Sequence, residues 1–102
     1  MTTRKHTENT VETGPKRFEM VKPFDFRGQR IDHLTAREPK VRDLRAFLRN
    51  AESDPILAVE TVLADLTQVD NPVIADMSIK DFGIMKAWFE AFLSDLIPNS
   101  AE

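Results

Sequence analysis

The chain has 102 residues, of which 41% are hydrophobic, 30% charged and 8% aromatic, with a net charge of -3 at pH 7. This length allows one small domain, and the composition is that of a soluble folded protein. The absence of cysteine excludes disulfides and thiolate metal sites. The sequence contains neither an apolar run of about 18 residues nor the apolar core of a signal peptide, so we expect a soluble, cytoplasmic protein.

Charge is divided between the two halves of the chain. Residues 1–49 carry 12 Lys and Arg against 7 Asp and Glu, a balance of +5, whereas residues 50–102 carry 2 against 10, a balance of -8. The basic half could attract an anionic partner. The two halves of one domain, or of two copies in a homo-oligomer, could equally attract each other, and this second interpretation is favoured.

Residues 1–16 are polar and lack apolar periodicity, which predicts a disordered arm. A β-hairpin is predicted over about residues 18–36, because apolar residues recur at every second position of its first strand: Phe18, Met20, Phe24 and Phe26. Pro23 has no N–H for a strand ladder, so we expect an edge strand or a bulge there. The hairpin is expected to turn at Asp25–Gly28 in a type I turn.

The returning strand changes phase between Ile31 and Leu34, and a second bulge near Asp32 and His33 would correct this. His33 is expected to have a surface or packing role. The only other histidine is His6.

Three main helices are predicted after the hairpin, over about residues 40–51, 54–67 and 78–96. The first follows Pro39, and its apolar residues share one face: Val41, Leu44, Phe47, Leu48 and Ala51. The charged residues off this face are expected to be solvated: Arg42, Asp43, Arg45 and Arg49. Arg45 and Arg49 repel each other, which suggests that they meet carboxylates or water.

The second helix begins with Asp54 as N-cap and Pro55 as its first residue. The third begins at Ser78, with Asp81 completing a capping-box pattern three residues later. The link between these two helices allows one short helical turn. Together these elements predict an α+β fold, with a single small domain over residues 17–97 and a polar tail over residues 98–102.

The last helix is apolar around more than one face. Its core stripe consists of Phe82, Met85, Phe89, Phe92, Leu93 and Leu96. Ile84 and Trp88 widen this apolar surface to an arc of more than about 200° around the helix. Either the helix is sandwiched between the hairpin and the other helices, or part of it contacts another chain. Trp and Phe are residue types that anchor protein interfaces, so both interpretations stay open.

No catalytic, cofactor-binding or metal-binding pattern is present in the sequence. The three glycines are scattered, and the aspartates of the second half do not have the spacing of a calcium loop. We therefore do not expect an enzyme. A nucleic-acid-binding role is the minor alternative, because five cations cluster around Pro39: Arg37, Lys40, Arg42, Arg45 and Arg49. The acidic second half and the pI of 5.4 disfavour it.

Three stretches resemble a known family by their order and spacing. They are LTAREPKVRDLRAF from Leu34 to Phe47, ILAVETVLADLTQV from Ile56 to Val69, and MSIKDFGIMKAWFEAFL from Met77 to Leu93. In this order they resemble the tail assembly chaperones of contractile-tailed, Mu-like phages and prophages. The resemblance spans roughly residues 18–96.

The resemblance implies a non-enzymatic protein that binds the tape measure protein of the tail and keeps that long helical chain soluble while tube subunits polymerise around it. It also implies action in the cytoplasm of the bacterial host, absence from the mature virion and, in many relatives, a longer partner made by a translational frameshift. The alternative from the same resemblance is a small structural tail component that stays in the particle.

A partner-binding surface is expected on the last helix. We predict that Ile84, Trp88 and Phe92 contact the helical client, because a chaperone for an amphipathic helix needs an exposed apolar groove. Arg37 and Arg42 near Pro39 are predicted to steer acidic stretches of the client towards this surface.

Overall fold

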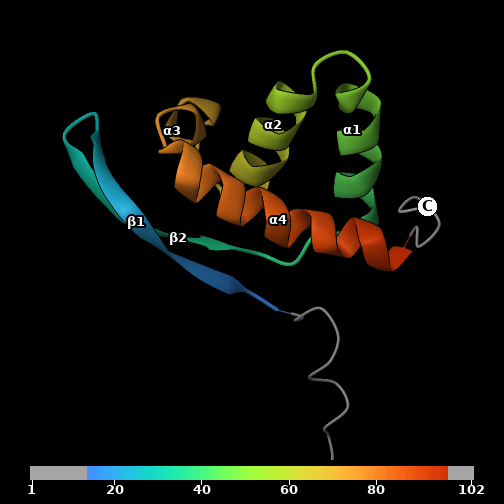
Figure 1. Cartoon of the computed structure of the whole chain (residues 1–102), viewed down its shortest axis with the longest axis horizontal. Helices are drawn as coiled ribbons and strands as arrows, with labels where there is room; N and C mark the ends of the chain where they lie inside the picture. Colours follow the sequence, from blue (N-terminus) through green and yellow to red (C-terminus); the bar gives the residue numbers. More distant parts are fainter. Residues whose placement is uncertain (1–13, 97–102) are drawn as a thin grey trace, which may run out of the picture.

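The computed structural model describes residues 14–96, in which a two-stranded hairpin is followed by four helices (Figure 1). The elements are β1 (Lys16–Phe26), β2 (Gln29–Ala36), α1 (Val41–Ala51), α2 (Pro55–Thr67), α3 (Asn71–Ala75) and α4 (Ile79–Leu96). The predicted α+β class, with an N-terminal hairpin and three main helices, is confirmed. Residues 1–13 of the expected arm and the expected polar tail lie outside the described residues.

The hairpin closes through a tighter turn than the sequence predicts. Phe26 pairs with Gln29, so only Arg27 and Gly28 form the loop, and both have positive φ values, of 51° and 80°. These are the signs of a type I′ turn, and the predicted type I turn is wrong. A type I′ turn follows the right-handed twist of the two strands, which a type I turn would splay apart.

One irregularity interrupts the pairing of β1 with β2. Glu19 pairs with His33 and Phe24 pairs with Ile31, so the four residues 20–23 of β1 stand opposite Asp32 alone. Pro23 lies inside this bulge, where its missing N–H leaves no gap in the ladder. The extra residues belong to β1, so the bulge expected on the returning strand is wrong.

The bulge is held by Asp81 in the first turn of α4. The backbone N–H groups of Val21 and Lys22 donate to Oδ1 and Oδ2 of Asp81 at 2.8 and 2.9 Å. The Ser78 hydroxyl donates to Oδ2 at 2.9 Å and accepts from the Asp81 N–H at 3.0 Å, so the helix start has the capping interaction that its sequence predicts. Asp81 is buried, at 1% exposure. Burial raises the pKa of this carboxyl, but the hydrogen bonds outweigh burial and hold the pKa below its ordinary value.

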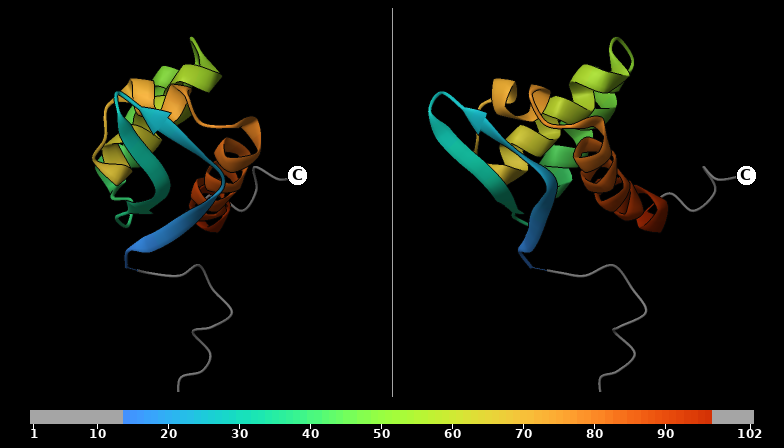
Figure 2. Two further views of the ribbon diagram at one scale, coloured as in Figure 1. Left: turned by 90° about the vertical axis from the view of Figure 1, so that its left-hand side faces the viewer. Right: turned by 60° about the vertical axis from the view of Figure 1, so that its left-hand side comes forward.

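The helices and the hairpin enclose one core. In Figure 1, α1 and α2 stand side by side and α4 runs across their lower ends. β1 packs against α4 and β2 against α2, and Figure 2 shows the twisted hairpin along one side of the helices. The most deeply buried large apolar side chains come from α2, α3 and α4: Leu63, Leu66, Ile74, Met85 and Phe89. Burying such a side chain stabilises the fold by about 1.5–3 kcal/mol, so these residues hold the helices together.

Local signals set the ends of α2. Asp54 caps the helix by accepting from the Leu57 N–H at 3.1 Å, and Pro55 is the first helical residue, as the sequence predicts. The helix ends at Gln68, which adopts the left-handed conformation with φ of 62°. The link to α4 contains one short helix, α3, whose Val73 and Ile74 are buried.

We expect Asp81→Asn to lower the free energy of unfolding by about 1–3 kcal/mol, because the amide NH₂ replaces a carboxylate oxygen and faces a backbone donor. Urea denaturation measures this change. Asp76→Asn is the matched control, because Asp76 is exposed and precedes the same helix. Equal midpoints for the two variants would contradict the structural role of Asp81.

The stability that Asp81 contributes to the wild-type protein should depend on pH. Because the pKa of Asp81 is lowered in the folded state, its stabilisation is complete above the unfolded pKa of about 3.9 and is lost as the pH falls through the folded pKa. The difference in the free energy of unfolding between wild type and Asp81→Asn should therefore be largest at neutral pH and should decrease in acid. A stability difference that stays constant down to about pH 2 would show that it does not arise from the charge of the Asp81 carboxylate.

Candidate protein-binding surface

Ile84, Trp88 and Phe92 form a stripe along α4, called here the α4 stripe, that is only partly covered. Ile84 is 44% exposed, and the other two are half-buried. The Trp88 ring makes edge contacts with Phe18 of β1 and with Phe92, each at 5.3 Å between centroids. The hairpin thus covers one side of the stripe while Ile84 faces solvent. Contact of the stripe with a partner stays a prediction.

Trp88 carries an energetic cost within the fold. Its indole Nε1 is buried and has no hydrogen-bond partner among the described residues. An unsatisfied buried donor costs about 1–3 kcal/mol. The ring is therefore held by its apolar and aromatic contacts rather than by its polar group.

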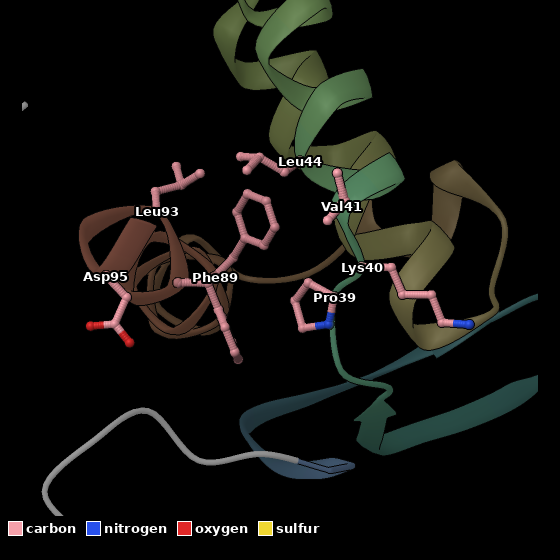
Figure 3. A pocket seen from close by; sticks show the side chains of 8 residues that line it. Pro39, Lys40, Val41, Leu44, Phe89, Leu93 and Asp95 are labelled. Atoms are coloured by element: carbon pink, nitrogen blue, oxygen red, sulfur yellow. The ribbon is translucent and has the colours of Figure 1, made fainter. Parts of the chain in front are cut away.

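A groove opens between α1 and the second half of α4 (Figure 3). This α1–α4 groove has a volume of about 200 Å³, and its apolar lining comes from both sides: Pro39, Val41 and Leu44, and opposite them Phe89, Phe92 and Leu93. Phe92 belongs to both the groove and the α4 stripe, so the two form one continuous apolar surface.

The groove continues onto the apolar face of α1 that the sequence predicts. Of that face, Phe47 is buried against Phe89, with ring centroids 5.1 Å apart. Val41 is 67% exposed and Leu48 44% exposed, so this apolar face is only partly buried. The reason is that α1 packs chiefly against α2, and no described element covers its Val41–Leu48 side.

The two cations predicted to steer a partner have different environments. Arg37 donates from Nη1 and Nη2 to the two oxygens of Asp43 at 2.9 and 3.0 Å, and its backbone N–H donates to the Leu66 carbonyl at 2.9 Å. This residue ties the end of β2 to both α1 and α2. Arg42 is exposed and makes no ion pair with residues 14–96. The structure therefore does not bring the two together as one free basic site.

Asp43 was expected to be solvated, and that expectation is wrong. The residue is 3% exposed and also accepts from the Lys40 N–H at 2.7 Å. Arg37 lowers the pKa of this carboxyl, with burial acting against it. A signal was present in the sequence, because Asp43 stands three residues after Lys40 at a helix start, where a carboxylate can accept an orphan backbone N–H.

Four polar residues within the stretches that resemble the chaperone family are therefore occupied by structural contacts. Arg37 and Asp43 join the hairpin to α1, and Asp81 joins it to α4 while Ser78 donates to Asp81. The part of this surface that stays open is mainly apolar. Such a surface can bind a partner by burying apolar area.

Two further findings limit the chemistry of the described region. Residues 14–96 contain no cluster of three or more His, Asp or Glu side chains placed to hold a metal ion. None of the helices found between those residues is long and apolar enough to cross a membrane.

Comparison with known protein families gives a match over most of the chain. A family model described as "Phage tail assembly chaperone proteins, E, or 41 or 14" matches residues 17–94. No curated protein and no solved structure has a significant match to the chain. The matched region includes all of the hairpin after Lys16 and the apolar lining of the α1–α4 groove.

We expect Arg37→Ala to lower the free energy of unfolding by about 2–3 kcal/mol, because Asp43 would be left buried without its counter-charge. Arg42→Ala is the matched control, because Arg42 is exposed and only five positions away, and it should change stability by less than about 0.5 kcal/mol. Urea denaturation of both variants measures the difference. If Arg42→Ala is as destabilising as Arg37→Ala, the assigned roles are wrong.

Proposed function

The chain belongs to the phage tail assembly chaperones, and from that membership we propose that it binds the tape measure protein and keeps this long helical chain soluble while the tail tube assembles. The observation that carries the proposal is the open apolar surface formed by the α4 stripe and the α1–α4 groove. A small folded domain gains no stability from leaving such side chains exposed. A client that buries them would gain binding free energy in proportion to the apolar area covered.

The shape of this surface suits a helical client. An amphipathic helix binds a groove through apolar side chains that recur at i, i+3, i+4 and i+7. Ile84, Trp88 and Phe92 follow one another at four-residue spacing, so together they offer a line of contacts along α4. Trp88 is anchored by Phe18 and needs little ordering when a client arrives, which favours a role as an interface anchor.

The two cations contribute unequally in this proposal. Arg42 is exposed, so its charge can accelerate encounter with an acidic client segment. The charge of Arg37 is largely neutralised by Asp43. Arg37 therefore chiefly positions the connection between β2 and α1, which lies beside the groove. The proposed protein has no catalytic activity, acts in the host cytoplasm, and takes tail tube subunits or a longer frameshifted form of itself as further partners.

We expect Ile84→Asp to reduce capture of the tape measure protein at least about tenfold, because a carboxylate would be desolvated in the apolar contact. Co-expression of the two proteins followed by affinity purification measures capture. Ile79→Asp is the matched control, because Ile79 lies on the same helix, is 88% exposed and falls outside the stripe. Circular dichroism verifies that both variants fold. Equal capture by both variants would rule out the α4 stripe as the client surface.

A chaperone and a structural tail component differ in their final location. We expect mass spectrometry of purified virions to detect the tube and tape measure proteins and not this chain, because a chaperone dissociates from its client once the tail has assembled. Lysates from the same cells are the control that the chain is made. Recovery of the chain in virions in fixed proportion to tube subunits would support the structural alternative.

A further inference from the structure

The α1 side of the α1–α4 groove is bordered by a row of exposed cations. Arg42, Arg45 and Arg49 are exposed and lie at i, i+3 and i+7, so they share one side of α1. None of the three makes an ion pair with residues 14–96. We call these residues the arginine row.

The arginine row lies beside an equally regular apolar line. Val41, Leu44 and Leu48 also recur at i, i+3 and i+7 and lie next to the arginines around the helix. The first two line the groove, and Leu48 extends their line along α1. This surface of α1 therefore consists of an apolar strip with positive charge along its outer edge.

The opposite wall of the groove has a different charge. Asp95 of α4 lines the groove on the side away from α1, as Figure 3 shows. Glu90 of the same helix pairs with Lys86 at 3.1 Å. An acidic group on a bound partner would thus be attracted towards α1 and repelled by Asp95.

From this arrangement we propose that the α1–α4 groove binds an amphipathic helix whose apolar face is bordered on one side by carboxylates, with that acidic side against Arg42, Arg45 and Arg49. This inference rests on the proposed function, since it specifies the kind of client segment that the groove accepts. Like charges at i, i+4 destabilise a helix, so Arg45 and Arg49 are unfavourable in the free protein and become favourable when carboxylates face them.

A partner protein fits these observations better than a nucleic acid does. Phosphate binding requires several cations and no apolar groove. Here the cations border exposed Val41 and Leu48 and a groove that contains Phe89 and Leu93. An amphipathic helix would cover both the apolar strip and the charges at once.

The test uses the full chain and two synthetic amphipathic helices with the same leucine face. One carries glutamates along one flank, and the other carries lysines at the same positions. Trp88 is the only tryptophan of the chain, and its contact with Phe92 makes its fluorescence a probe of the groove. We expect the glutamate peptide to bind at least about fivefold more tightly, with a preference that shrinks as salt is added.

Charge reversal supplies the decisive comparison. The Arg45→Glu, Arg49→Glu variant should invert the preference and bind the lysine peptide more tightly. The control variant Arg30→Glu, Lys80→Glu has the same change in net charge away from the groove and should keep the wild-type preference. All four positions are exposed, so these variants are expected to fold, which circular dichroism verifies. Val41→Asp, Leu48→Asp should weaken binding of both peptides.

The outcomes separate this inference from the proposed function. Equal binding of the two peptides, or an unchanged preference after Arg45→Glu, Arg49→Glu, would overturn the acidic-helix site even if capture of the tape measure protein persists. Inversion of the preference supports the site even if capture fails, and the proposed client would then be wrong. Tighter binding of a generic DNA duplex than of the glutamate peptide at low salt would overturn the inference in favour of phosphate recognition.

Discussion

The two hydrogen bonds from the β1 bulge to Asp81 fix the hairpin on the helices. They join residues about 60 positions apart in the chain, and they do so at the first turn of α4, where a carboxylate is also favoured by the helix dipole. Because β1 is held at this point, Phe18 reaches Trp88 and covers one side of the α4 stripe. The position of the hairpin therefore decides which part of α4 remains open.

A second buried carboxylate performs the corresponding task at the start of α1. Asp43 receives the Arg37 guanidinium and the Lys40 N–H, so β2 enters α1 at a set angle and Pro39 lies at the edge of the groove. Asp43 and Asp81 are each the third residue of their helix. The polar residues within the stretches that resemble the chaperone family thus form two joints of the fold, one between the hairpin and α1 and the other between the hairpin and α4.

The two joints and the proposed binding surface use different kinds of side chain. The joints use polar side chains that are buried and paired, whereas the open surface uses apolar side chains and exposed arginines that form no ion pair with residues 14–96. Arg37 belongs to the joints, because its guanidinium donates to both oxygens of buried Asp43.

The sequence by itself determined the kinds of elements, their order and most of their caps, because periodicity and signals such as Asp54 with Pro55, or Ser78 with Asp81, act within a few residues. Tertiary structure decided the partner of Asp43, the strand that carries the bulge, and the exposure of Val41 and Leu48. These depend on groups brought together from distant parts of the chain, and a helix pattern cannot indicate whether another element will cover its apolar face. The α4 stripe shows both effects, since its breadth was evident from spacing and its partial coverage followed only from the placement of the hairpin.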